Sequence, residues 1–393
     1  MILLVFSALA CLTGMVIVTV LHNQHWLDVV VDPAEPRPGA PCLSVIVPAR
    51  NEERNIRRCV EALLDQTYPE YELIVLDDRS TDATPRILAE LAAADRRLQV
   101  VRGVDLPAGW AGKPHALAQA ARLACGEWLC FVDADTFVTQ QALASVHAKA
   151  VETGADLFTI MTDQEVETFW ERVVLPLVFT ALSVGFSPRR VNDPRTKDAI
   201  ANGQFIFIRR SVYQAIGGHA ALKESIVEDK DLAVLTKRSG FRLIMADGRQ
   251  VARTRMYTSL PEMWEGWTKN IFLGLKGSAG LLLLGAIGAV LSLTAALVLP
   301  LWLASGLSVA LAGWPPLADF PSWSGWVLAL EAALLWGTLI FWRVLALRAM
   351  RVPAWYALTV PLGAGVFAAM MFASTWKVLS GRGVTWKGRR YQR

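Results

Sequence analysis

The sequence EWLCFVDAD, residues 127–135, is an apolar run that ends in two aspartates one residue apart. Three similar runs precede it: LSVIVP (43–48), ELIVLD (72–77) and LQVVRG (98–103). Amphipathic stretches of helical length separate these runs, at residues 54–66, 82–93 and 114–124, and another follows at 140–152. Apolar strands that alternate with helices form a mostly parallel sheet covered on both faces. We therefore predict an α/β domain over residues 43–260, with its ligand site at the carboxyl ends of the strands.

The rest of the chain is strongly apolar. Of 393 residues, 53% are hydrophobic and 19% are charged, a composition typical of a protein with membrane helices. We expect, in chain order, the following parts outside the α/β domain: an uncleaved N-terminal transmembrane anchor (1–22), a proline-rich linker (23–42), an amphipathic interfacial segment (261–278), about three C-terminal transmembrane helices (279–376) and a basic tail (377–393).

The charges of the tail predict the orientation in the membrane. Six basic residues follow residue 376, which predicts a cytoplasmic tail in a multi-pass protein of the inner membrane, with a cytoplasmic catalytic domain. Three C-terminal spans would instead place the tail and the domain on opposite sides. Either one segment is re-entrant, or residues 279–312 form a hairpin interrupted at Pro300, and the sequence leaves both open.

Two classes of site are excluded by composition. The five cysteines form no CxxC pair, so neither a disulfide framework nor a zinc site is indicated. Aromatic residues are not interleaved with Lys and Arg as they are on a nucleic-acid surface, so we expect no nucleic-acid partner.

The two aspartates after the fourth run, Asp133 and Asp135, suggest a metal site. Residues i and i+2 of a strand point the same way, so both carboxylates are expected to aim at one point beyond the sheet. Mg²⁺ or Mn²⁺ held there together with a diphosphate fits this chemistry. For a lone pair of aspartates, a solvated turn would be the alternative.

Further polar residues follow the first two runs. Asp77 and Asp78 end the second run and can accept hydrogen bonds from a nucleotide, whereas Asp82 reads as a helix N-cap. The glycine-flanked loop before Lys113 suits a diphosphate, since glycine permits close approach and lysine adds a positive charge.

Five motifs in order, PARNEE (48–53), LDDRSTD (76–82), GKPHALAQA (112–120), VDADT (132–136) and VEDKDL (227–232), resemble the family 2 glycosyltransferases, which have the GT-A fold. More finely, the chain resembles bacterial enzymes of carotenoid and hopanoid glycosylation and, more distantly, ceramide glucosyltransferases. The resemblance implies these roles: Pro48, Ala49 and Glu52 around a uridine, Asp78 or Asp77 on the base, Lys113 at the diphosphate, Asp133 and Asp135 on the metal, and Asp229 as catalytic base.

The residues around Asp229 support that last role independently. Inverting transfer to an alcohol needs one carboxylate opposite the leaving group to take the hydroxyl proton. Glu228 and Asp229 open an amphipathic stretch and supply such a group, with Asp229 as the base and Glu228 as the second candidate. Acids that merely cap a helix are the alternative.

Residues on the acceptor side are less clearly marked. An apolar run begins with Gly203 and Gln204, which either form a turn or contact the acceptor. The amphipathic segment contains three more candidates, Trp264, Trp267 and Lys269. The QxxRW motif of processive synthases and ceramide glucosyltransferases is absent before Trp267, which disfavours polymerisation and leaves Lys269 as a replacement for the arginine.

These observations predict a metal-dependent inverting transferase that moves a sugar from a nucleotide-sugar donor, expected to be a UDP-hexose, to a membrane lipid. A carotenoid, hopanoid, sphingolipid or glycerolipid acceptor remains open, as does the oligomeric state. The alternatives are a processive synthase of polysaccharide or exported glycan, and a non-catalytic membrane protein that retained the fold.

Overall fold

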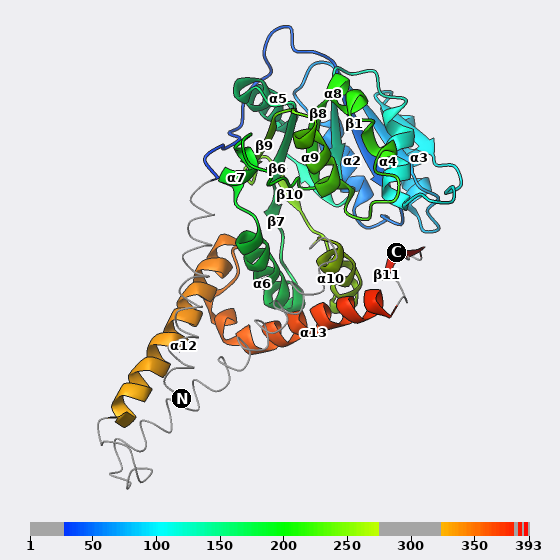
Figure 1. Cartoon of the computed structure of the whole chain (residues 1–393). Coiled ribbons are helices and arrows are strands. Elements are labelled where there is room, and N and C mark those ends of the chain that lie inside the picture. Colours follow the sequence, from blue (N-terminus) through cyan, green and yellow to red (C-terminus); the bar gives the residue numbers. More distant parts are fainter. Residues whose placement is uncertain (1–26, 275–323, 381–383, 387–388, 392–393) are drawn as a thin grey trace.

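The computed structural model describes residues 27–274, 324–380, 384–386 and 389–391 (Figure 1). The expected N-terminal anchor and residues 275–323, which include the first expected C-terminal span, lie outside the described residues.

A seven-stranded sheet forms the centre of the α/β domain, in the order β3-β2-β1-β4-β8-β6-β9. Its strands are β1 (Leu43–Ala49), β2 (Tyr71–Asp77), β3 (Leu98–Arg102), β4 (Trp128–Val132), β6 (Leu157–Met161), β8 (Phe205–Arg209) and β9 (Leu243–Asp247). All are parallel except β8, which runs antiparallel to both β4 and β6. A second sheet, in the order β5-β10-β7, contains β5 (Thr136–Val138), β7 (Asp163–Gln164) and β10 (Ala252–Thr254). The predicted mostly parallel sheet is thus confirmed.

Helices cover both faces of the large sheet, as the wholly apolar strands require (Figure 1). On β1, Val45 and Val47 belong to one core and Ile46 to the other, since successive side chains point to opposite faces. One core contains residues of α2 (Ile56–Leu64), α3 (Thr84–Ala94) and α5 (Ala142–Thr153). The other contains residues of α4 (Gly112–Ala121), α7 (Pro188–Asn192), α8 (Arg210–Ala215) and α9 (Glu228–Arg238), and the 3-10 helix η1 (Gly218–Ala220) lies beside α8.

The proline-rich linker, predicted to be a separate segment, is attached to the sheet. The backbone N–H of Val31 donates to the Asp247 carbonyl at 2.9 Å, and the N–H of Asp247 donates to the Val29 carbonyl at 2.8 Å. Val31 is fully buried. The linker therefore extends the edge strand β9, because an open sheet edge offers unpaired backbone groups to any extended segment nearby.

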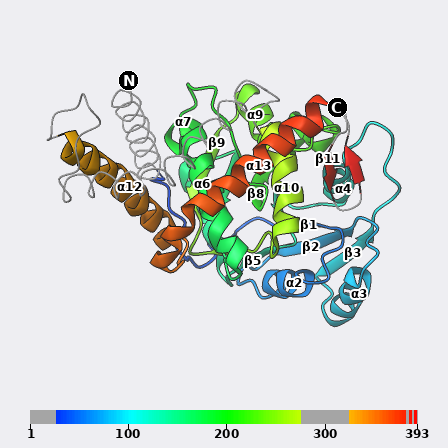
Figure 2. The ribbon, with the colours of Figure 1, turned by 90° about the horizontal axis from the view of Figure 1, so that it is seen from below.

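Below the domain lies a layer of apolar helices (Figures 1 and 2). It comprises α6 (Phe169–Gly185), α10 (Leu260–Gly274), α12 (Ser324–Ala349), the 3-10 helix η2 (Ala354–Thr359) and α13 (Val360–Leu379), followed by a hairpin of β11 (Val384–Trp386) and β12 (Arg389–Tyr391). Helix α6 was not predicted from the sequence. In the part of the chain described here, one helix, at residues 354–377, is long and apolar enough to cross a membrane, by length and composition alone.

A proline explains how α12 is joined to α6. Pro176 lies inside α6 and has no N–H, so the carbonyl of Arg172 loses its partner within the helix. The guanidinium of Arg343 on α12 donates from Nη2 to the carbonyls of Arg172 at 3.2 Å and Val173 at 3.0 Å. Arg343 thus supplies a hydrogen bond to the Arg172 carbonyl, which the proline leaves without a donor within the helix.

Candidate active site

A cavity of about 1020 Å³ lies at the carboxyl ends of β1, β2 and β4, where the sequence predicted the site. Asp133 and Asp135 both line it. The reason given for their shared direction was wrong, because β4 ends at Val132 and both aspartates lie in a turn that the Thr136 N–H closes onto the Asp133 carbonyl at 3.0 Å. The turn, and not strand alternation, brings them to one cavity.

The loops after β1 and β2 hold each other in place. Asn51 and Arg79 adopt left-handed backbone conformations, with φ of 52° and 60°, that non-glycine residues seldom use. The Asn51 N–H donates to Ser80 Oγ at 2.9 Å, and Asn51 Oδ1 accepts from the Thr81 N–H at 2.8 Å. Strained backbone conformations of this kind persist where many surrounding contacts hold them, and they are common at binding sites.

The structure separates the two candidate aspartates of this region. The Asp77 carboxylate accepts the N–H of Ser80 at 3.1 Å and does not line the cavity, an arrangement that favours a turn role. Asp78 lines the cavity together with Pro48, Ala49 and Glu52. Asp82 accepts the N–H groups of Thr84 and Glu53, each at 3.0 Å, and so caps α3 from one residue before the formal N-cap Ala83.

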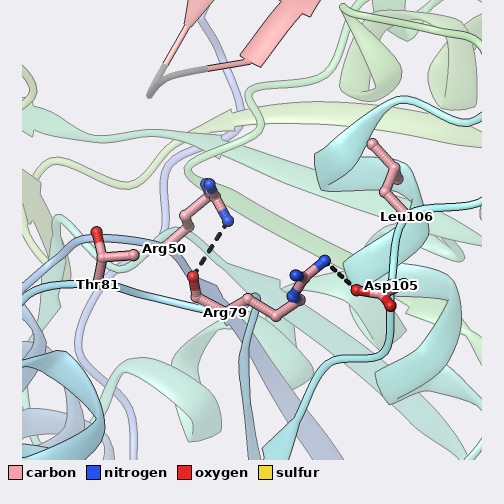
Figure 3. A pocket seen from close by; sticks show the side chains of 5 residues that line it. All are labelled: Arg50, Arg79, Thr81, Asp105 and Leu106. Carbon is pink, nitrogen blue, oxygen red and sulfur yellow. Dashed lines mark hydrogen bonds and ion pairs between the residues drawn. The ribbon is translucent and has the colours of Figure 1, made fainter.

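A shallow pocket adjoins the cavity beyond Arg50, which lines both (Figure 3). Arg50 donates to the carbonyls of Asp78 at 2.6 Å and Arg79 at 3.3 Å, and Arg79 forms an ion pair with Asp105. The side chains of Arg50 and Arg79 thereby fix the backbone that presents Asp78.

Lys113 connects the predicted metal site to Glu228, the second candidate for the base. It lies in the first turn of α4, and its Nζ is 2.7 Å from Asp133 Oδ1 and 2.9 Å from Glu228 Oε1. Burial alone would lower the pKa of Lys113, but the two carboxylates outweigh it and raise that pKa. Burial likewise opposes ionisation of Glu228, yet the Lys113 ammonium lowers its pKa. Both groups are therefore charged.

Asp229 lies beside this pair with a different electrostatic character. Its Oδ2 accepts the N–H of Gly203 at 3.0 Å, and its Oδ1 accepts the N–H of Lys230 at 2.7 Å. Desolvation, and after it the negative charge of Glu228, raises the pKa of Asp229 to about 6. A carboxylate whose pKa lies near the working pH is suited to general-base catalysis.

The acceptor-side candidates divide into two groups. Gly203, Gln204, Trp267 and Lys269 line the cavity, whereas Trp264 does not and packs in the apolar cluster between α6 and α10. Burial lowers the pKa of Lys269 to about 8. The sequence alone could not separate Trp264 from Trp267, because the exposure of two tryptophans three residues apart depends on how the helix packs.

Helix α6 supplies the part of the cavity that sequence reasoning missed. Phe179, Leu182 and Phe186 line it, as do Met256 and Met350. This apolar arm continues from the carboxylates toward the helical layer. The only sequence signal was the capping box of Thr168 and Glu171, which precedes an apolar run and marks the start of a helix.

His219, a buried histidine of η1, does not line the cavity. The Tyr213 hydroxyl lies 2.9 Å from His219 Nδ1, and burial lowers the pKa of the imidazole to about 4. His219 is a neutral core residue.

The side chains present fit the predicted divalent cation. Within the described residues, no group of three or more His, Cys, Asp or Glu is arranged to hold a metal by itself. Mg²⁺ and Mn²⁺ need only one or two protein carboxylates where phosphate oxygens complete the shell. Asp133 already binds a cation, the Lys113 ammonium, and Asp135 lies next to it on the cavity wall.

Comparison with known proteins agrees with this architecture. Residues 44–217 match the family described as Glycosyl transferase family 2. The 4,4'-diaponeurosporenoate glycosyltransferase of Staphylococcus aureus (strain USA300) is 29% identical over 241 residues, which are 60% of this chain and 62% of that protein. The match thus spans less than two thirds of the relative. The structure of a mannosyltransferase from Pyrobaculum calidifontis, in complex with GDP-Man and Mn²⁺, has a TM-score of 0.54 at 18% identity, covering 95% of this chain and 97% of that one. Its likeness supports the GT-A fold.

Proposed function

Since residues 44–217 match the family described as Glycosyl transferase family 2, we propose that this protein transfers a hexose from a UDP-hexose, with inversion, to a hydroxyl group of an apolar membrane lipid. The observation that carries the proposal is one continuous cavity. It joins the nucleotide end at Asp78, the base Asp229 and the apolar arm of Phe179, Leu182 and Phe186.

The donor end is built for a nucleotide diphosphate. Asp78 and Glu52 would accept hydrogen bonds from the uridine, and Asp133 and Asp135 would hold a divalent cation at the diphosphate. The cation, when bound, neutralises the charge that develops on the departing diphosphate. Lys113, now between Asp133 and Glu228, lies where its ammonium can turn toward the same phosphates.

The acceptor end matches a neutral, apolar molecule. The tail of the acceptor lies along the apolar arm, and its hydroxyl approaches Asp229, which removes the proton as the oxygen attacks the anomeric carbon. Gly203 orients the carboxylate through its N–H. The relative is named as a glycosyltransferase of 4,4'-diaponeurosporenoate, whose name denotes a carboxylate, so it supports an apolar lipid acceptor but not the hydroxyl group.

The direct test measures UDP release by the purified protein in membranes made from its host's lipid extract. A panel of UDP-sugars is supplied with Mg²⁺ or Mn²⁺, and the glycolipid formed is identified by mass spectrometry. We expect release that needs both the metal and the lipid. If only GDP-sugars support transfer, the donor is a GDP-sugar and not a UDP-sugar. A polymeric product would indicate a synthase. No transfer with any donor would support the non-catalytic alternative.

The raised pKa of Asp229 predicts the pH profile. The base acts when deprotonated, so kcat/KM should be constant above about pH 7 and fall tenfold per pH unit below pH 6. Glu228→Gln removes the negative charge beside Asp229 and so lowers the pKa of Asp229. The acidic limb, the fall of kcat/KM at low pH, should therefore move to lower pH. UDP release measured from pH 5 to 8.5 tests the shift, and a limb at the same pH in both proteins contradicts it.

Gly203 should tolerate no side chain. A Cβ atom there would lie 2.8 Å from Asp229 Oδ2 and 3.2 Å from its Cβ, so Gly203→Ala must displace the base. We expect kcat to fall about 10²-fold, the loss typical of an angstrom-scale misplacement. Gly337→Ala is the control, because nothing lies within 4 Å of the added atom. Equal activity of both variants would show that Asp229 does not need its present position.

A further inference from the structure

The helices η2 and α13 carry an exposed apolar stripe along one side. The large side chains Trp355, Leu358, Leu362, Phe372 and Trp376 are 59%, 67%, 45%, 45% and 65% exposed. Together with the exposed Ala369, they recur at intervals of three, four or seven residues, which is the spacing of one helix face. No charged residue lies on this stripe. It extends along nearly the whole length of η2 and α13.

The opposite side of α13 packs on the catalytic half of the protein. Gly363 fits so closely against α6 that a Cβ atom would lie 2.7 Å from the Val173 carbonyl oxygen. Farther along, Ser374 Oγ donates to the Thr268 carbonyl of α10 at 2.6 Å. Figure 2 shows α13 lying across α6 and α10.

The chain bends sharply where α12 ends. The N–H of Val352 donates to the Leu347 carbonyl at 2.8 Å, and Arg351 takes a left-handed conformation with φ of 55°, a Schellman-type helix end. Arg351 also pairs with Asp163 of β7 at 3.2 Å. Helix α12 thus ends at the catalytic domain, and η2 begins there.

Both ends of α13 therefore lie on the side of the catalytic domain. Near its start, Tyr356 packs against Phe169 of α6, with ring centroids 6.0 Å apart. After its end, the strand β11 contacts α10. A helix that crosses a bilayer has its ends on opposite faces of a hydrocarbon core about 30 Å thick.

We propose that α13 lies along the membrane surface with its stripe in the lipid, and does not cross the bilayer. The occupant of the stripe is lipid because the stripe is uncharged, presents the Trp, Phe and Leu side chains that interfacial helices bury in the lipid, and continues from the apolar helix α12. This orientation places the basic tail on the side of the catalytic domain. It removes the conflict between three spans and a cytoplasmic tail, and it does not depend on the proposed reaction.

Depth measurements separate a surface helix from a spanning one. Leu362→Cys, Ala369→Cys and Trp376→Cys are made one at a time in a chain with Cys11, Cys42 and Cys125 replaced by serine, and each is labelled with a fluorophore. Vesicles then carry nitroxide quenchers at a shallow or a deep position of the acyl chain. A surface helix gives the same shallow quenching at all three positions. Deep quenching at residue 369 alone overturns the proposal, and so does an absence of quenching at all three, which would mean that protein covers the stripe.

Sidedness is an independent check. Ser380→Cys, just after α13, and Ala89→Cys, on the exposed side of α3, are each introduced into the same serine background. Sealed membrane vesicles of known orientation are treated with an impermeant maleimide. We expect both positions to react from the same side. Reaction from opposite sides overturns the proposal, and the Ala89→Cys variant shows which side the catalytic domain faces.

Discussion

Asp229→Asn is expected to lower kcat by about 10²- to 10⁴-fold while the affinity for the donor stays close to that of the unchanged protein. The asparagine keeps the shape of the side chain and one oxygen for the N–H of Gly203 or Lys230. It cannot take a proton from the acceptor hydroxyl. The loss should therefore appear in kcat, measured as UDP release at saturating donor and acceptor, with donor affinity measured separately by calorimetry.

The folding of this variant provides the control. The folded state raises the pKa of Asp229 to about 6. The contribution of Asp229 to the free energy of unfolding is therefore lost as the pH rises through that value and the side chain ionises. At pH 7.5 the neutral asparagine should leave the Tm equal to or above that of the unchanged protein. If activity survives, Glu228 becomes the candidate base. If activity and Tm fall together, the loss says nothing in favour of Asp229.

The second large effect is expected for the double variant Asp133→Asn, Asp135→Asn. Removing both carboxylates removes the protein's ligands for the cation that stabilises the leaving diphosphate, which contributes several kcal/mol to the transition state. We expect kcat/KM to fall at least about 10³-fold. Activity measured over a titration of Mg²⁺ or Mn²⁺ should not recover at any metal concentration.

Glu152→Gln is the matched control for this variant. Glu152 is an exposed carboxylate on α5 that pairs only with Lys149 among the described residues, and it does not line the cavity. Its replacement should leave both the rate and the metal dependence unchanged. Metal-dependent turnover by the double variant, at a rate near that of Glu152→Gln, would show that other groups bind the cation.

Both predictions concern groups whose charges are balanced within a few ångströms. Lys113 contacts Asp133 and Glu228 together, and Glu228 in turn raises the pKa of Asp229. A change at one of these positions is felt at the others, so the effects of double substitutions here should not be additive.

The sequence alone predicted the α/β domain, its mostly parallel sheet, and two pairs of aspartates, Asp77 with Asp78 and Asp133 with Asp135, at neighbouring strand ends. These follow from local rules, since apolar runs separated by amphipathic helices admit a parallel sheet whose strand ends meet at one edge. The antiparallel strand β8 could not be read this way, because its apolar run looks like that of its parallel neighbours.

Which members of each motif reach the cavity depends on how the loops pack, which the sequence alone does not show. Asp77 and Asp78 are adjacent in sequence, yet one closes a turn and the other faces the ligand, because the loop conformation set by Asn51 and Arg79 selects between them. The same holds for α13, whose composition matches a membrane span. One of its faces is apolar because it packs on α6 and α10. The mean hydropathy adds both faces together, so it does not show whether protein or lipid covers each of them.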